Sequence, residues 1–192
     1  MIVIVHGTSA SGRDAVCALL CEQHAFERYS LMSSVRDVLL AVDPLIGRHT
    51  SLRSVVEPSG WDHVMDRPVY RTQVVRLLGT TARALRSTFG RDVLVDLLVS
   101  RVLDEHGGTV PDYVRVVIDD VRHTDEVEAL CSRLGAQVLS VEDADGTAER
   151  LPDRLVDGRV RFEQGDLDEL AEQVKEVMGL RSGPSSSGLM AD

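Results

Sequence analysis

The chain contains a single lysine, Lys175, among its 192 residues, whereas it contains 20 arginines. Arginine therefore takes the place of lysine across the sequence, and a motif that normally carries lysine can carry arginine here for reasons unrelated to function. No run of basic residues is present, and the formal net charge is -10. Because a surface for a nucleic-acid polymer needs a basic face, a polymer partner is disfavoured. A small anionic ligand stays open, since a few local arginines can bind one.

The sequence also lacks long apolar runs and a set of cysteines that could pair. The apolar run Ile2–Val5 is too short for a membrane span or for the core of a signal peptide. The three cysteines cannot all pair, and their spacing fits no zinc motif: Cys17, Cys21 and Cys131. We therefore expect a cytoplasmic protein without a membrane segment, whose cysteines are reduced core residues.

Apolar runs and helical periodicity alternate along the chain. Apolar runs predict strands at residues 1–6, 26–30, 113–118, 136–141 and 159–162. Apolar residues at helical spacing predict helices at residues 13–24, 35–42, 69–86, 91–105, 124–134 and 166–178. Proline and glycine punctuate residues 43–68, and we expect this stretch to be an irregular binding region. The alternation predicts a three-layer α/β fold in which helices flank a mainly parallel, five-stranded sheet.

The loop between the first strand and the first helix consists of small residues between two glycines, followed by arginine and aspartate. Small residues let backbone N–H groups turn toward phosphate oxygens, and the helix N-terminus adds free donors. A cation after the second glycine, here Arg13, neutralises charge on the β and γ phosphates. The context predicts a P-loop NTPase fold that binds a nucleoside triphosphate through Gly7, Ser9, Ala10, Ser11, Gly12, Arg13 and Asp14. A turn that only connects strand and helix is the alternative.

A second set of polar residues follows the apolar strand that ends at Ile118. Such a strand delivers a carboxylate, Asp119, to the carboxyl edge of the sheet, where ligands sit in open α/β folds. We expect Asp14 and Asp119 to hold Mg²⁺, partly through water, because hard cations favour carboxylate oxygens. Arg122 is close enough in sequence to reach the phosphates. The alternatives are a helix-capping role for Asp119 and a surface salt bridge between Arg122 and Glu126.

These segments resemble the bacteriophage deoxynucleoside monophosphate kinases, a branch of the P-loop nucleoside monophosphate kinases. The loop at residues 7–14 is similar to that family's GxxxxGKD loop, and Val117–Glu126 is similar to its strand-DDVR-x-x-x-E motif. Three further segments carry the likeness, at residues 31–39, 76–83 and 162–170. The resemblance implies transfer of the γ-phosphoryl group of ATP to a deoxynucleoside monophosphate, with Mg²⁺ as the metal.

The resemblance also implies roles for individual residues. It gives catalytic roles to Arg13, Asp119 and Arg122, and it places Gln164 near the adenine of ATP. Four arginines become candidates for gripping the acceptor phosphate, because the guanidinium is a two-pronged donor: Arg36, Arg71, Arg76 and Arg83. Two aromatic residues become candidates for stacking on the base: Trp61 and Tyr70. Each arginine could instead be a solvated helix charge, and each aromatic residue a core residue.

The resulting domain organisation is one kinase domain at residues 1–180 and a disordered tail at 181–192. Within the domain, residues 43–86 are the expected acceptor-binding insertion and residues 142–157 a candidate lid. The expected partner is a small nucleotide, a homodimer stays open, and a phage-encoded protein would reside in the host cytoplasm. Two other functions stay open. One is a P-loop kinase of another small metabolite, and the other is a nucleotide-binding protein whose degenerate loop no longer supports transfer.

Overall fold

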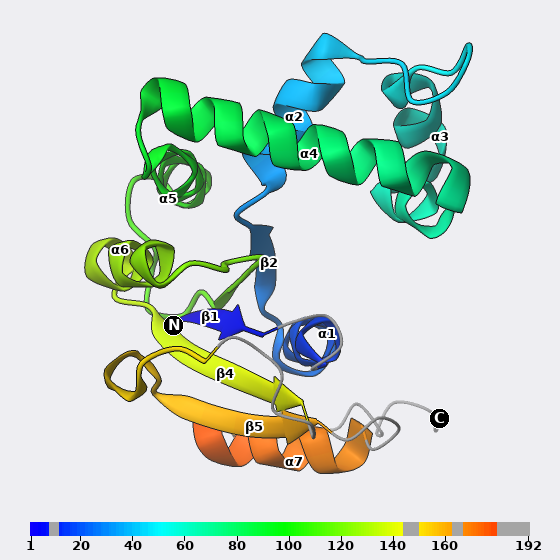
Figure 1. The fold of residues 1–192 in the computed structure, drawn as a ribbon. Helices are drawn as coiled ribbons and strands as arrows, with labels where there is room; N and C mark the ends of the chain where they lie inside the picture. Colours follow the sequence, from blue (N-terminus) through cyan, green and yellow to red (C-terminus); the bar gives the residue numbers. More distant parts are fainter. Residues whose placement is uncertain (8–11, 144–149, 163–166, 180–192) are drawn as a thin grey trace, which may run out of the picture. The chain divides into compact units, whose positions relative to one another are not determined.

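The computed structural model describes residues 1–7, 12–143, 150–162 and 167–179, and it contains the predicted five-stranded sheet (Figure 1). All strand pairs are parallel, and the strand order is β2-β3-β1-β4-β5. The strands are β1 Ile2–His6, β2 Glu27–Ser30, β3 Val116–Asp119, β4 Gln137–Asp143 and β5 Gly158–Phe162. The predicted layering is confirmed: helices flank a parallel, five-stranded sheet on both faces, and residues 7–12 connect central strand β1 to the first helix.

Helices follow the strands at nearly the predicted positions. They are α1 Arg13–His24, α2 Ser33–Val42, α3 Leu52–Asp66, α4 Pro68–Phe89, α5 Val93–Glu105, α6 Thr124–Leu134 and α7 Leu167–Met178, with a short 3-10 helix, η2, at Asp153–Leu155. Within the described ranges, none of the helices has the length and apolar composition that crossing a membrane requires.

The chain divides into two compact units. The first, Met1–Ser30 with Val102–Asp192, contains the whole sheet, and the second is Leu31–Arg101. The predicted insertion at residues 43–86 falls within the second unit. The predicted lid at residues 142–157 belongs to the first unit, where the end of β4 and η2 occupy part of it.

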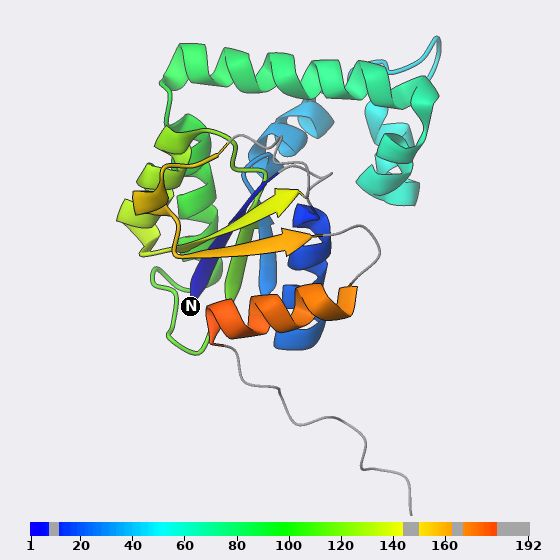
Figure 2. The same ribbon diagram turned by 60° about the horizontal axis from the view of Figure 1, so that its bottom comes forward.

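The two faces of the sheet follow from the alternation of side chains along each strand. Val3 and Val5 of β1 belong to the apolar cluster that α1 and α7 cover (Figure 2). Ile2 and Ile4 point to the opposite face and are also buried, and α6 packs against β4 on that side. Because both faces are covered, the central strands β1 and β3 are apolar over most of their length, whereas the edge strands β2 and β5 carry charged residues.

The second unit has its own apolar cluster, built from α2, α3 and α4: Leu39, Ile46, Leu52, Val56, Val64 and Val74. The prediction that residues 43–68 are irregular is wrong, because residues 52–66 form α3. Leu52 and Val56 lie one helical turn apart and are buried. Gly60 adopts a non-helical φ of 80°, and α3 is kinked at this residue into two helical parts. Pro68 opens α4, which is the position in a helix where the missing N–H of proline costs least.

Candidate functional site

Strand order brings the two predicted polar segments together within the first unit. β1 and β3 are parallel neighbours, so their carboxyl ends lie at the same edge of the sheet. The loop after β1 leads into α1, which begins at Arg13, and β3 ends at Asp119. Both residues are buried, with side chains that are 8% and 3% exposed. Charged side chains are rarely this buried unless they are paired, which indicates a built site.

Gly12 fixes the entry to α1. It adopts a φ of 86°, in the left-handed region, and among the residues that the structure describes no side chain caps the first turn of the helix. A Cβ atom at this position would lie 2.4 Å from Cγ of Phe162, at the end of β5. Glycine is therefore required here both by the backbone and by the neighbouring ring. The absence of a capping side chain leaves the first N–H groups of α1 to other acceptors, which suits an anionic ligand.

The charged residues at this edge form an alternating series of ion pairs. Arg13 contacts Asp120 through Nη1 (3.2 Å to Oδ1) and Asp14 through Nη2 (3.2 Å to Oδ1). Arg28 then joins Asp14 to Asp119: its Nη2 lies 3.1 Å from Oδ1 of Asp14, and its Nε donates to Oδ2 of Asp119 at 2.6 Å. Three carboxylates and two guanidinium groups leave one excess negative charge. A triphosphate therefore needs a further cation to bind at this edge.

Burial sets the protonation behaviour of Asp119. Desolvation raises the pKa of its carboxyl group, and the nearby charge of Asp120 raises it further, while Arg28 opposes both. Asp120 itself adopts a φ of 60°, a left-handed conformation that aspartate tolerates better than most residues. Its Oδ2 accepts a hydrogen bond from Oγ of Ser30 (2.9 Å). The backbone turn after β3 thus presents two consecutive carboxylates to the same cluster.

The carboxylates at this edge are of the chemical type that binds a magnesium ion. Within the part of the chain that the structure describes, Oδ1 of buried Asp119 has no hydrogen-bond partner. Within the same residues, no group of three or more metal-binding side chains is present. Mg²⁺ commonly binds through one or two carboxylates, with water and substrate phosphates completing its shell. The predicted pair, Asp14 and Asp119, offers two carboxylates of this kind, and the guanidinium of Arg28 contacts both.

Sequence reasoning missed Arg28, and the pairing of β2 with β3 explains its place. Arg28 lies opposite Val117 and Ser30 lies opposite Asp119 in the parallel register. Residues two apart on a strand share a face, so Arg28 and Asp119 are diagonal neighbours on one face. Arg28 and Asp119 are 91 residues apart in sequence. The available signal was a short strand with two charged residues, Glu27 and Arg28, but the partner of Arg28 depends on strand order.

The side chain of Arg122 does not form the salt bridge that was the alternative to a role at the phosphates. Its side chain is exposed, and among the described residues it makes no hydrogen bond or ion pair. Among the described residues the alternative, a salt bridge to Glu126, is not formed, and Oε2 of Glu126 instead accepts the backbone N–H groups of Arg122 and His123, both at 3.3 Å. This arrangement caps α6 and leaves the guanidinium of Arg122 available to a ligand.

The acceptor candidates all lie in the second unit. The guanidinium of Arg36 stacks over the ring of Trp61, 5.7 Å from its centroid, which brings two predicted residues together. Trp61 and Tyr70 are partly buried and pack against the apolar cluster of that unit. Three exposed arginines lie on α4: Arg71, Arg76 and Arg83. At about 100° per residue, Arg76 and Arg83 share one face and Arg71 lies on another.

Four predicted ATP-binding residues lie outside the described residues: Ser9, Ala10, Ser11 and Gln164. Gly7 follows β1 directly and Gly12 precedes α1, so the two glycines stand at the predicted ends of the loop.

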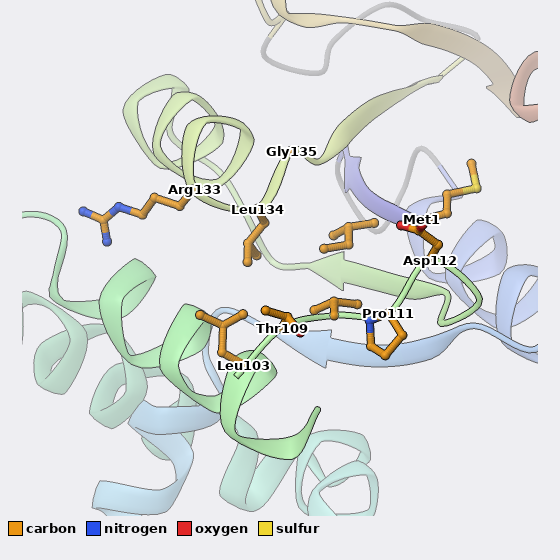
Figure 3. A pocket seen from close by; sticks show the side chains of 10 residues that line it. Met1, Leu103, Thr109, Pro111, Asp112, Arg133, Leu134 and Gly135 are labelled. Carbon is orange, nitrogen blue, oxygen red and sulfur yellow. The ribbon is translucent and has the colours of Figure 1, made fainter. Parts of the chain in front are cut away.

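A pocket of about 370 Å³ lies at the opposite edge of the sheet, beside Met1 and Ile2 at the start of β1. Leu103, Pro111 and Leu134 contribute to its walls, and the guanidinium of Arg133 points away from them (Figure 3). Because the predicted loop follows the other end of β1, this pocket contains none of the predicted residues.

No protein-family model matches the chain, and no curated protein matches it either. Among solved structures, the chain is similar to a crystal structure of shikimate kinase from Aquifex aeolicus. The identity is 12%, the match covers 93% of this chain and 96% of that chain, and the TM-score is 0.41. A likeness this distant carries no argument about substrate, so the function has to be argued from the site.

Proposed function

We propose that the protein is a phosphotransferase that moves the γ-phosphoryl group of ATP to the phosphate of a deoxynucleoside monophosphate. The observation that carries the proposal is the series of ion pairs that joins Arg13, at the start of α1, to Asp119, at the end of β3. It places a cation and a buried carboxylate together at the edge of the sheet where open α/β folds bind ligands.

The first turn of α1 supports a site for the phosphates of ATP. Gly12 admits the chain into the helix without a capping side chain, so the N–H groups of that turn can donate to phosphate oxygens. Arg13 has the position after the second glycine, where a cation neutralises charge on the β and γ phosphates. Arg122 is exposed and would add a second donor for the transferred phosphoryl group.

Asp14 and Asp119 would hold Mg²⁺, and Asp120 adds negative charge beside them. When bound, the ion neutralises charge on the phosphates and offsets the excess negative charge of the carboxylate cluster. The chain's own contribution is positioning and electrostatics. Such transfers need alignment and charge neutralisation more than covalent participation by the protein. These residues supply the types of group that such a transfer requires.

The deoxynucleotide acceptor rests on the sequence resemblance to phage kinases and on the composition of the second unit. In a chain of net charge -10, exposed arginines at Arg71, Arg76 and Arg83 and the stacked pair Arg36–Trp61 are suited to an anionic substrate with a flat base. Arginine binds phosphate through two parallel hydrogen bonds, and its plane stacks on aromatic rings.

A second function is favoured by one observation. Both terminal nitrogens of Arg13 are engaged with carboxylates, Asp14 and Asp120. A loop in which the cation stays with these carboxylates would bind nucleotide without transferring the phosphoryl group. This protein would be a nucleotide-binding module and not an enzyme.

A coupled assay of ADP release separates the two functions. The purified chain is incubated with ATP, Mg²⁺ and each of the deoxynucleoside monophosphates, and turnover with at least one of them is expected. Asp119→Asn should reduce that turnover at least about 100-fold, because it removes a charged metal ligand. The matched control is Asp153→Asn, which neutralises an exposed aspartate of the same unit and should stay within about twofold. ATP binding without turnover of any acceptor would support the nucleotide-binding module instead.

A further inference from the structure

Arg28 occupies the position between the two predicted magnesium ligands. Its Nε and Nη2 both contact Oδ2 of Asp119, at 2.6 and 2.5 Å, and Nη2 also lies 3.1 Å from Oδ1 of Asp14. One guanidinium thus bridges carboxylates from α1 and β3. A divalent ion at this site would be expected to bridge the same two carboxylates. Short, charge-assisted contacts of this kind are among the stronger hydrogen bonds in proteins.

The remaining oxygen of Asp119 points to a further ligand. Its side chain is 3% exposed, yet Oδ1 has no hydrogen-bond partner among the described residues. A buried carboxylate oxygen without a partner is costly, so its persistence needs an explanation. Arg28 satisfies only one of the two oxygens, so the carboxylate can exchange this incomplete partner for another cation.

The exposure of Arg28 allows it to leave. Its side chain is 41% exposed, whereas Asp119 is nearly inaccessible, so the guanidinium can turn into solvent while the carboxylate stays in place. A divalent ion and a guanidinium that share two carboxylates at contact distance repel one another strongly. Binding of either cation therefore weakens binding of the other.

We propose that Arg28 is a resident cation of the metal site: it compensates the charge of Asp14 and Asp119 before the metal binds, and Mg²⁺ must displace it from them. Arg28 is thus a positioning residue, and the divalent ion competes with it. This inference rests on the proposed function, because that function requires a divalent ion at these two carboxylates.

The test is a titration of the nucleotide-free protein with Mn²⁺, in which free Mn²⁺ is followed by electron paramagnetic resonance. Arg28→Gln removes the competing charge, so Mn²⁺ affinity should rise about tenfold or more. Arg159→Gln is the matched control. Arg159 is 42% exposed, lies on edge strand β5 and contacts two carboxylates, Glu142 and Asp153, and its variant should stay within about twofold of the parent.

Thermal unfolding gives a second readout that does not depend on activity. Without metal, Arg28→Gln should lower the Tm by about 3–8 °C, because Asp119 loses the group that compensates its charge. A saturating Mg²⁺ concentration should raise the Tm of this variant more than that of the parent protein, since the ion replaces the lost cation. Arg28→Lys keeps the charge, so its Mn²⁺ affinity should stay within about threefold of the parent.

A measurement on the parent protein covers the case in which Arg28→Gln does not fold. In a proton–nitrogen NMR spectrum of arginine side chains, the Nε–H signal of Arg28, assigned by its loss in Arg28→Lys, should shift when Mg²⁺ is added. The Nε–H signal of Arg159 should not. Three results would overturn the proposal. The first is an Arg28 signal that does not shift, the second is Mn²⁺ binding that is unaltered or weaker in Arg28→Gln, and the third is no Mn²⁺ binding by either protein. ADP release is measured in parallel. If Mg²⁺ and Arg28 compete but no phosphoryl transfer is detected, the proposed function is contradicted and this inference is not.

Discussion

Nη1 of Arg13 lies 3.2 Å from Oδ1 of Asp120, which links the first turn of α1 to the residue after β3. The same guanidinium contacts Asp14 through its other terminal nitrogen. The residue that follows the second glycine of the loop is therefore held by carboxylates on two sides. A lysine ammonium is a single point charge and cannot keep both contacts with the geometry of a planar fork.

Replacement of Arg13 tests whether its charge or its shape matters. We expect Arg13→Lys to keep or raise phosphoryl transfer, because the ammonium still neutralises the phosphates and is released more easily from the carboxylates. Arg13→Met removes the charge and should reduce kcat/KM at least about 100-fold. Both are measured by ADP release at saturating Mg²⁺. Complete loss of activity in Arg13→Lys would show that the planar guanidinium has a role of its own.

Gly12→Ala should destabilise the protein and weaken ATP binding together. The new Cβ would meet the Phe162 ring at 2.4 Å and would also require a φ of 86°. Strain and overpacking together should cost about 2–4 kcal/mol in the free energy of unfolding, measured by urea denaturation. Gly135→Ala is the control, since that residue has a φ of 62° but open space around it, and it should cost only about 1 kcal/mol. Equal costs for the two variants would contradict the contact with Phe162.

The thiol of Cys17 should be inert in the folded protein. Burial and the charge of Asp119 raise its pKa to about 12, so almost none of it is ionised at pH 8. Alkylation by iodoacetamide at pH 8, followed by mass spectrometry of peptides, should label Cys17 more than about 100 times slower in the folded chain than in 6 M guanidinium. Labelling of Cys17 in the folded chain at the unfolded rate would show that the first unit opens readily.

His24 should make stability depend on pH below neutrality. Burial, reinforced by Arg115 and Lys175, lowers its pKa in the folded state below the ordinary value of 6.5. As pH falls below 6.5, the unfolded state binds the proton first, so the free energy of unfolding decreases until the folded pKa is passed. Urea denaturation between pH 7.5 and 5 should show a steeper loss for the parent protein than for His24→Asn. Parallel curves for the two proteins would rule out a lowered pKa.

Much of the fold could be predicted from the sequence because its signals are local. The buried run of β1 and the apolar spacing of α6 lie within single segments, and the structure has both where they were expected. The error at residues 43–68 has the same origin. Proline and glycine there predict breaks in secondary structure, but α3 begins after Ser51 and buries Leu52 and Val56 in the second unit. The burial of these apolar side chains against other helices of the unit outweighs the low helix propensity of proline and glycine. A short window of sequence does not show which residues will be buried in this way.

The segments that form the candidate site could be predicted from the sequence, but the ion pairs between their side chains could not. The glycine loop and the residues after β3 are readable as motifs, since each follows an apolar strand. The contact from Arg28 to Asp119 depends on β2 lying beside β3, although 91 residues separate the two side chains in sequence. The engagement of Arg13 with Asp120 also depends on the left-handed turn at Asp120. Both features are products of strand order and backbone geometry.

Calorimetric titration of the protein with ATP, in the presence and absence of Mg²⁺, tests the central claim most directly. The claim is that N–H groups at the start of α1 bind a triphosphate while Asp14 and Asp119 hold the metal. We expect Mg²⁺-dependent binding with a Kd below about 100 µM, which Asp119→Asn weakens and Asp153→Asn does not. The absence of any Mg²⁺-dependent affinity for a purine nucleoside triphosphate would contradict the account.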